Sequence, residues 1–436
     1  MLRVAILALL LIVGLVGSQF LPRVLGSAYA AAHDIFSILT MVALGYIMIQ
    51  VGREFDLEKS RVRDYAWDYV VAATAAAFPW LFVAAYFVFM VLPDTTWPAW
   101  EEALHTARFA APTSAGVLFG MLAAAGLAET WVFKKVRLLA IFDDLDTVLL
   151  MVALQIMILG KSWELVSVAV LAVGLLWLAW SRFRRMAWPS TWPWVLAYAG
   201  AITAMSEGLN RGSTLLGTTV PIQMGVLLPA FALGCMLAPE RDPARISLEA
   251  ERHVAAFVCG AFMLLVGLHM PVISGSGAAS GEAAGGVFES ITAGQPMPGW
   301  DVIAWHVLAV TVLSNLGKLF PAACYRKEAP LRERIALAIG MWPRGEVGAG
   351  VLFVSLGTGI GGPMVTIAVL SLSLNLVLTG LFIWLVKWLI MGNEAPPSAQ
   401  TPHRIPRLGT GRTKKRPQLQ GSRFGPTSRR SELRPP

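Results

Sequence analysis

Long apolar runs, separated by short charged or glycine- and proline-rich joints, make up most of this chain. An α-helix needs about 20 predominantly apolar residues to cross a bilayer. By that criterion the pattern predicts an all-α polytopic membrane protein with about twelve transmembrane helices, numbered below as spans 1 to 12. The spans are expected near residues 2–21, 34–51, 66–92, 104–127, 135–160, 162–180, 191–208, 218–238, 252–270, 301–324, 331–357 and 362–390.

Composition supports this class and restricts the partners. Hydrophobic residues make up 56% of the chain and charged residues 14%, a balance too apolar for a soluble domain. Residues 394–436 contain ten Lys/Arg and two acidic residues, so this segment carries the whole net charge of +8. We therefore expect a membrane transporter domain over 1–393 and a disordered basic cytoplasmic tail over 394–436, and no nucleic-acid partner.

Basic residues alternate between the joints and predict the orientation. The joints after spans 2, 4, 6, 8 and 10 hold seventeen Lys/Arg, whereas the other joints hold three. The positive-inside rule then places both termini in the cytoplasm of a multi-pass protein in the cell's inner (plasma) membrane. Ala28-Tyr29-Ala30 resembles a signal cleavage site, but the apolar run ends well before it, which favours an uncleaved first helix.

Span 5 carries three carboxylates in an otherwise apolar stretch: Asp143, Asp144 and Asp146. A charged Asp at the centre of a membrane helix costs about 2.5–3.5 kcal/mol, so these groups need protonation, a basic partner, a bound cation or water. Asp143, Asp146 and Thr147 share one helical face by their spacing. Oxygen ligands of this kind suit a hard monovalent cation, so Asp144 and Asp143 are the principal candidates and Asp146 and Thr147 secondary ones. A helix end at which the acids reach water is the alternative.

Span 4 is interrupted by Pro112-Thr113-Ser114. Proline removes a backbone donor and clashes with the preceding turn, so the helix should break there. Unwound backbone at this depth is tolerated only inside protein or beside a watery cavity, where carbonyls and hydroxyls can hold a cation. We therefore count Thr113 and Ser114 among the candidate cation ligands. The alternative is a simple kink.

Span 11 has a second interruption, Pro343-Arg344-Gly345-Glu346. Spans 4 and 11 are each the middle member of a triplet, which is the inverted-repeat pattern of secondary transporters. Opposed half-helix ends would then lie near the midplane. We expect Arg344 and Glu346 to neutralise these ends rather than to bind the ion.

Span 10 contains Asn315 and Lys318 within an apolar run. Lys318 either extends toward the nearby basic joint or pairs with a span 5 carboxylate, and Asn315 is a secondary site candidate. Arg108, near the start of span 4, is expected to reach toward the membrane surface. The histidines and the three cysteines show no metal-ligand spacing, so no cofactor is predicted.

Taken in order, these motifs resemble the monovalent cation:proton antiporter superfamily, which comprises sodium/proton exchangers and their potassium-efflux relatives. The resemblance covers spans 2 to 12. It implies a six-helix core domain (about 66–160 and 301–390), with discontinuous helices 4 and 11 crossing, that moves against a scaffold and dimer domain (about 2–51 and 162–270). It also implies that Asp144 alternately holds a cation or a proton, that Asp143 pairs with Lys318, and that the protein is a homodimer.

The sequence thus predicts a secondary antiporter that exchanges a monovalent cation for protons by alternating access, and not an enzyme. Sodium is the first choice of ion, and lithium and potassium are alternatives. A sodium-coupled solute symporter on the same scaffold is a second hypothesis. An intramembrane aspartyl protease is a distant third, because such an enzyme needs two acids facing each other from different helices, whereas Asp143 and Asp144 are adjacent on one helix.

Overall fold

The structure is a computed structural model, in which residues 1–393 form one compact unit and residues 394–436 a second. The description below concerns the first unit alone. It covers residues 2–54, 62–114, 121–122, 125–159, 170, 173–175, 177–182, 185–215, 226–238, 245–270, 291, 295–356 and 359–391. The predicted basic tail lies outside the described residues.

Within the described residues the secondary structure is helical, apart from an isolated bridge between Met186 and Leu237. The helices are α1 (Leu2–Leu25), η1 (Gly26–Ala28), α2 (Tyr29–Glu54), α3 (Val62–Met90), α4 (Trp97–Ala107), η3 (Arg108–Ala110), α6 (Trp131–Leu159), α8 (Trp192–Leu215), α9 (Leu227–Met236), α10 (Arg245–Leu268), α11 (Trp300–Gly317), α12 (Pro321–Cys324), α13 (Leu331–Gly340), α14 (Glu346–Leu356) and α15 (Gly362–Met391).

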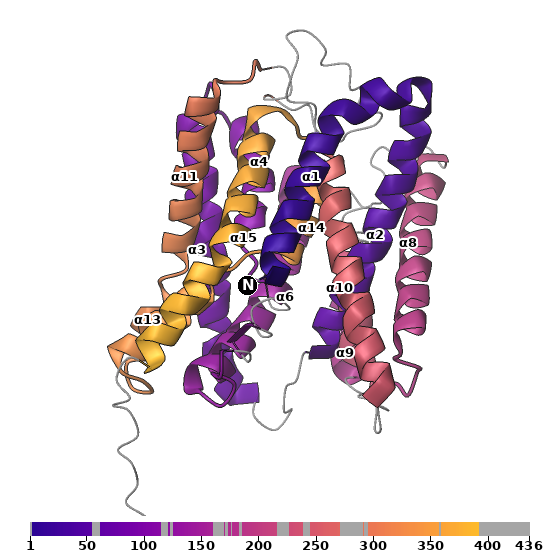
Figure 1. The fold of residues 1–436 in the computed structure, drawn as a ribbon. Coiled ribbons are helices and arrows are strands. Elements are labelled where there is room, and N and C mark those ends of the chain that lie inside the picture. Colours follow the sequence, from indigo (N-terminus) through magenta and orange to yellow (C-terminus); the bar gives the residue numbers. More distant parts are fainter. Residues whose placement is uncertain are drawn as a thin grey trace, which may run out of the picture. The chain divides into compact units, whose positions relative to one another are not determined.

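The helices form two groups that lie side by side (Figure 1). In the first group, which we call the scaffold group, α1 packs on α10, and α2 packs on α8, α9 and α10. In the second, the core group, α3 packs on α4, α6 and α11, while α15 packs on α11 and α13. Helix α14 belongs to the core group and also contacts α2 and α10. Movement of one group against the other stays a prediction.

Reciprocal glycine contacts bring two pairs of scaffold helices very close together. A Cβ atom on Gly14 of α1 would lie 2.2 Å from the carbonyl oxygen of Leu264 in α10. A Cβ atom on Gly52 of α2 would lie 2.4 Å from the carbonyl oxygen of Phe231 in α9. Small residues permit such close backbone approach, which is a common device of helix packing in membranes. These positions therefore require glycine.

Five helical stretches of the described chain are long and apolar enough to cross a membrane, and the first of them, Ala5–Arg53, includes both α1 and α2. This agrees with a polytopic all-α class, while the count of twelve spans stays a prediction. The stretch Trp300–Cys324 agrees with the expected range of span 10, but its helix is interrupted, because α11 ends at Gly317 and α12 starts only at Pro321. A Cβ on Gly317 would lie 2.5 Å from the backbone nitrogen of Pro79, and Pro321 has no N–H to continue the helix.

Candidate functional site

The two sequence interruptions meet in the middle of the core group. Helix α4 and its last turn, η3, end before the non-helical residues 111–114, and α13 and α14 are separated by the non-helical residues 341–345. The Ser114 N–H donates to the Pro343 carbonyl oxygen at 2.9 Å, so each break satisfies part of the backbone of the other. A Cβ on Gly345 would lie 2.7 Å from the Ser114 hydroxyl oxygen, so glycine is needed for the approach. The second half of span 4 lies mostly outside the described residues.

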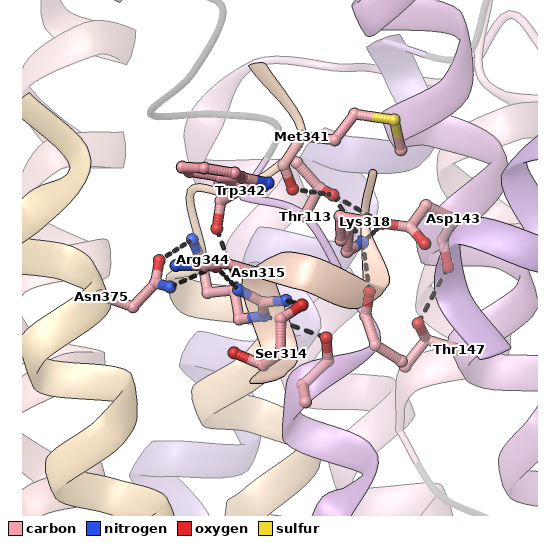
Figure 2. Close-up of polar contacts among 12 residues, drawn as sticks. Thr113, Asp143, Thr147, Ser314, Asn315, Lys318, Met341, Trp342, Arg344 and Asn375 are labelled. Atoms are coloured by element: carbon pink, nitrogen blue, oxygen red, sulfur yellow. Dashed lines mark hydrogen bonds and ion pairs between the residues drawn. The ribbon is translucent and has the colours of Figure 1, made fainter. Parts of the chain in front are cut away.

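A buried ion pair lies beside these breaks. Lys318, at the C-terminal end of α11, donates to the Asp143 carboxylate of α6 at 2.5 Å, and both side chains are 0% exposed. The lysine also donates to the Ala111 carbonyl oxygen and to the Thr113 hydroxyl, the latter at 2.9 Å. Figure 2 shows Asp143, Lys318 and Thr113 converging with the Met341 carbonyl group of the other break. The ammonium group of Lys318 thus links α6, α11 and the unwound part of span 4.

Thr113 has more possible partners than its single hydroxyl proton can serve. Its oxygen lies 2.6 Å from an Asp143 carboxylate oxygen and 3.1 Å from the Met341 carbonyl oxygen. The hydroxyl can donate to one of these acceptors at a time. The second Asp143 oxygen, Oδ1, is buried and has no hydrogen-bond partner among the described residues. The site is therefore rich in oxygen atoms that can bind a cation or a proton.

The other two carboxylates of α6 are also buried. Asp144 is 0% exposed and lies about 100° further around the helix than Asp143. Asp146 is 5% exposed and accepts a hydrogen bond of 2.7 Å from the Tyr69 hydroxyl of α3. The Thr147 hydroxyl donates to the backbone oxygen of Asp143 at 2.8 Å, which is a local contact within the helix. The alternative in which these acids reach water at a helix end does not describe this structure.

Arg344 binds backbone and amide oxygens from several elements. It donates from Nε to the Ala110 carbonyl oxygen at 2.9 Å and from Nη2 to the Ser314 carbonyl oxygen at 2.8 Å. Its Nη1 donates to the Asn315 side-chain oxygen at 2.6 Å, and Asn375 of α15 donates to that same oxygen at 2.9 Å (Figure 2). Because Ala110 ends the half-helix of α4 and η3, the guanidinium lies at the negative end of its dipole.

Glu346 lies at the complementary position. It is the first residue of α14, so its carboxylate is near the positive end of that half-helix. The Ser114 hydroxyl donates to this carboxylate at 2.7 Å. Arg344 and Glu346 form no ion pair with each other within the described residues. Each lies at the end of a half-helix instead, and the Ser114 hydroxyl donates to Glu346 rather than to Asp143.

The two breaks have similar partners at similar sequence separations. Thr113 contacts Asp143, 30 residues further along the chain. Arg344 contacts Asn375, 31 residues further along, through its backbone N–H and the amide oxygen at 3.1 Å. Each interrupted helix is thus linked to a polar residue of the next long helix, which is consistent with an inverted repeat. The first repeat carries a carboxylate at this place and the second a neutral amide.

Two polar clusters near the site differ from the sequence predictions. Arg108 does not reach the membrane surface: it is 2% exposed and donates to the Ser355 hydroxyl of α14 at 3.0 Å. Its helix, η3, ends only two residues further on, against α14, so the side chain points into protein. A second cluster, which was not predicted from the sequence, joins the starts of α3 and α6.

In this second cluster Lys135 of α6 lies 2.8 Å from the Asp68 carboxylate of α3 and 3.1 Å from that of Glu328. The Tyr325 hydroxyl donates to Asp68 at 2.7 Å. Burial, together with this carboxylate, raises the pKa of Tyr325, so the phenol stays protonated and acts as a donor. The cluster fixes α6, which carries Asp143, against α3 and the turn after α12.

Comparison with known proteins identifies the fold. No protein-family model and no curated protein sequence matches this chain. Among solved structures, the sodium proton antiporter MjNhaP1 from Methanocaldococcus jannaschii, determined at pH 8, matches with a TM-score of 0.52 at 16% sequence identity. The match covers 86% of this chain and 92% of the antiporter chain. This all-helical membrane protein therefore has the fold of a sodium proton antiporter.

Proposed function

We propose that this protein is a secondary antiporter of the monovalent cation:proton antiporter superfamily. It exchanges a monovalent cation, sodium first and lithium or potassium as alternatives, for protons by alternating access. Both termini lie in the cytoplasm, the protein spans the plasma membrane as a homodimer, and it needs no cofactor because the cation and proton are its substrates. The fold of MjNhaP1, a sodium proton antiporter, supports this proposal.

The observation that carries the proposal is a set of buried carboxylates beside two broken helices. An isolated buried charge is too costly to keep without a partner, and Asp143 has that partner in Lys318. Asp144, next to it and equally buried, is the group for which the two substrates compete. Its negative charge can be neutralised either by a proton or by a cation.

Competition at one carboxylate explains how exchange is coupled. With a proton or a cation bound, the site is neutralised and can cross between the two sides of the membrane. With neither bound, the site keeps a charge whose transfer through a low-dielectric region is unfavourable. Neutral loading by one substrate at a time therefore gives antiport rather than cotransport. Thr113 and the carbonyl groups of the breaks supply further oxygen ligands.

The test is cation-dependent proton movement in reconstituted vesicles. We expect the wild-type protein to release a preformed proton gradient when sodium is added, and Asp144→Asn to lose this response completely because an amide binds neither substrate as a carboxylate does. Asp301→Asn, which changes an exposed acid at the start of α11, is the matched control and should exchange normally. Full exchange by Asp144→Asn would rule out the assignment. Sodium uptake without any proton flux would favour a solute symporter instead.

A further inference from the structure

The start of α13 and the end of α15 lie together at one corner of the core group, next to the turn after α12 (Figure 1). Basic residues occur in all three segments. Arg326 and Lys327 are exposed in the turn, and Lys387 is exposed in α15. Arg332 is half-buried in the first turn of α13. Within the described residues none of these four forms an ion pair with a carboxylate.

Exposed aromatic side chains lie directly beside these cations. Trp384, Lys387 and Trp388 are spaced i, i+3 and i+4 and share one face of α15. Both tryptophans are 55% exposed. The Arg332 guanidinium carbon lies 5.5 Å from the centroid of the Trp388 ring, which is a cation–π distance. Stacking on the ring orients the guanidinium and leaves its N–H groups available to an anion.

The combination of cationic, aromatic and apolar side chains at this corner indicates that it binds an amphiphilic anion. Tryptophan prefers the headgroup level of a bilayer, where one side of the ring is apolar and the other is wet. The adjacent exposed surface is apolar, with Leu331 at 58% exposed and Leu381 at 49%. Basic sites between helices at this level bind lipid headgroups. A soluble phosphate would use the cations but would gain nothing from the tryptophans and leucines.

We propose that this corner, formed by Arg332, Lys387, Trp384 and Trp388, is a binding site for the phosphate headgroup of an anionic phospholipid. Arg332 and Lys387 hold the phosphate, the tryptophans contact the glycerol region, and the acyl chains lie along the apolar face of α13 and α15. The site anchors the core group, rather than the scaffold group, to the bilayer surface. The proposal does not depend on which ion the protein transports.

The experiment measures the thermal unfolding midpoint of the full-length purified protein while phosphatidylglycerol, phosphatidylcholine or inorganic phosphate is added in detergent. A basic residue near an anionic lipid surface contributes about a fivefold effect on binding. Arg332→Gln combined with Lys387→Gln should therefore raise the half-saturating phosphatidylglycerol concentration about 25-fold. Lys387→Gln alone changes one exposed side chain and should raise it about fivefold.

The control is Arg182→Gln combined with Arg185→Gln, which removes the same charge from two exposed residues before α8. It should leave the half-saturating concentration within about twofold of the wild-type value, since a twofold change is under half of what one removed contact costs. Equal stabilisation by phosphatidylcholine, saturation by inorganic phosphate alone, or equal losses in the control and the Arg332/Lys387 variant would each overturn the proposal.

Discussion

Replacing Lys318 with alanine would leave the Asp143 carboxylate buried without its direct cationic partner. Both side chains are 0% exposed, and the lysine also donates to the Ala111 carbonyl oxygen and the Thr113 hydroxyl. Removing one member of a buried ion pair costs about 3–5 kcal/mol. With an unfolding entropy of about 2.1 cal/mol/K per residue over roughly 390 residues, this corresponds to a fall of about 4–6 °C in the unfolding midpoint.

The pH dependence distinguishes a lost charge pair from lost packing. Burial disfavours the charged form of a carboxyl group that has lost its cationic partner, so at lower pH Asp143 in the variant can take up a proton, which removes the uncompensated charge. The midpoint deficit of Lys318→Ala relative to wild type should therefore be largest near pH 8 and shrink toward pH 5. The double variant Lys318→Ala/Asp143→Asn, in which neither charge remains, should recover most of the deficit at pH 8.

The assay is thermal unfolding of purified protein in detergent at both pH values, with Lys134→Ala as the control. Lys134 is 66% exposed in its side chain and lies 3.6 Å from a Glu129 carboxylate that is 95% exposed. Such a surface pair contributes about 0–1 kcal/mol, so the control should shift the midpoint by about 1 °C or less. If Lys318→Ala unfolds like this control, or if the deficit in its unfolding midpoint does not change with pH, the contact between Lys318 and Asp143 does not stabilise the protein through its charges.

Other contacts lead to further predictions. Gly14→Ala should lower the unfolding midpoint by several degrees, because its Cβ would lie 2.2 Å from a backbone oxygen, whereas Gly17→Ala meets only the flexible end of a leucine side chain at 2.9 Å and should be nearly silent. Equal midpoints would contradict the proposed packing. Arg344→Lys should lower the stability by about 2–4 kcal/mol in the same assay, since an ammonium cannot reproduce the planar fork that contacts the three oxygens described above and the Trp342 carbonyl oxygen. If Arg344→Lys had the unfolding midpoint of the wild-type protein, a positive charge at this position would be enough for stability.

Local sequence rules anticipated the helix interruptions. Pro112 and Pro343 each lie in a non-helical stretch, because proline acts on its own backbone and needs no distant partner. The cost of burying its charge left Lys318 two possibilities, to extend toward the basic joint or to pair with a span 5 carboxylate. The family resemblance named Asp143 as the partner, and the structure has this ion pair, whose geometry depends on how α6 is rotated toward α11.

The contacts between helices that lie far apart in the chain could not be predicted from the sequence. Nothing in the spacing links Tyr69 to Asp146, 77 residues away, or Lys135 to Asp68, 67 residues away. Asn375 was missed although it offered a signal, as a lone amide in an apolar helix is costly unless it finds a partner. The prediction for Arg108 was wrong because a position near a helix end suggests access to water. In the structure α14 packs over that helix end and buries the side chain.

The central claim is that a proton and a metal cation compete for Asp144. Its most direct test is proton release from purified protein in weakly buffered solution when sodium, lithium or potassium chloride is added near pH 8. The account predicts that the transported cation displaces protons from the wild-type protein. For each unit by which the pH is lowered, the half-saturating cation concentration should rise by up to about tenfold. Asp144→Asn should release no protons. Cation binding without proton release by the wild-type protein, or equal release by Asp144→Asn, would contradict it.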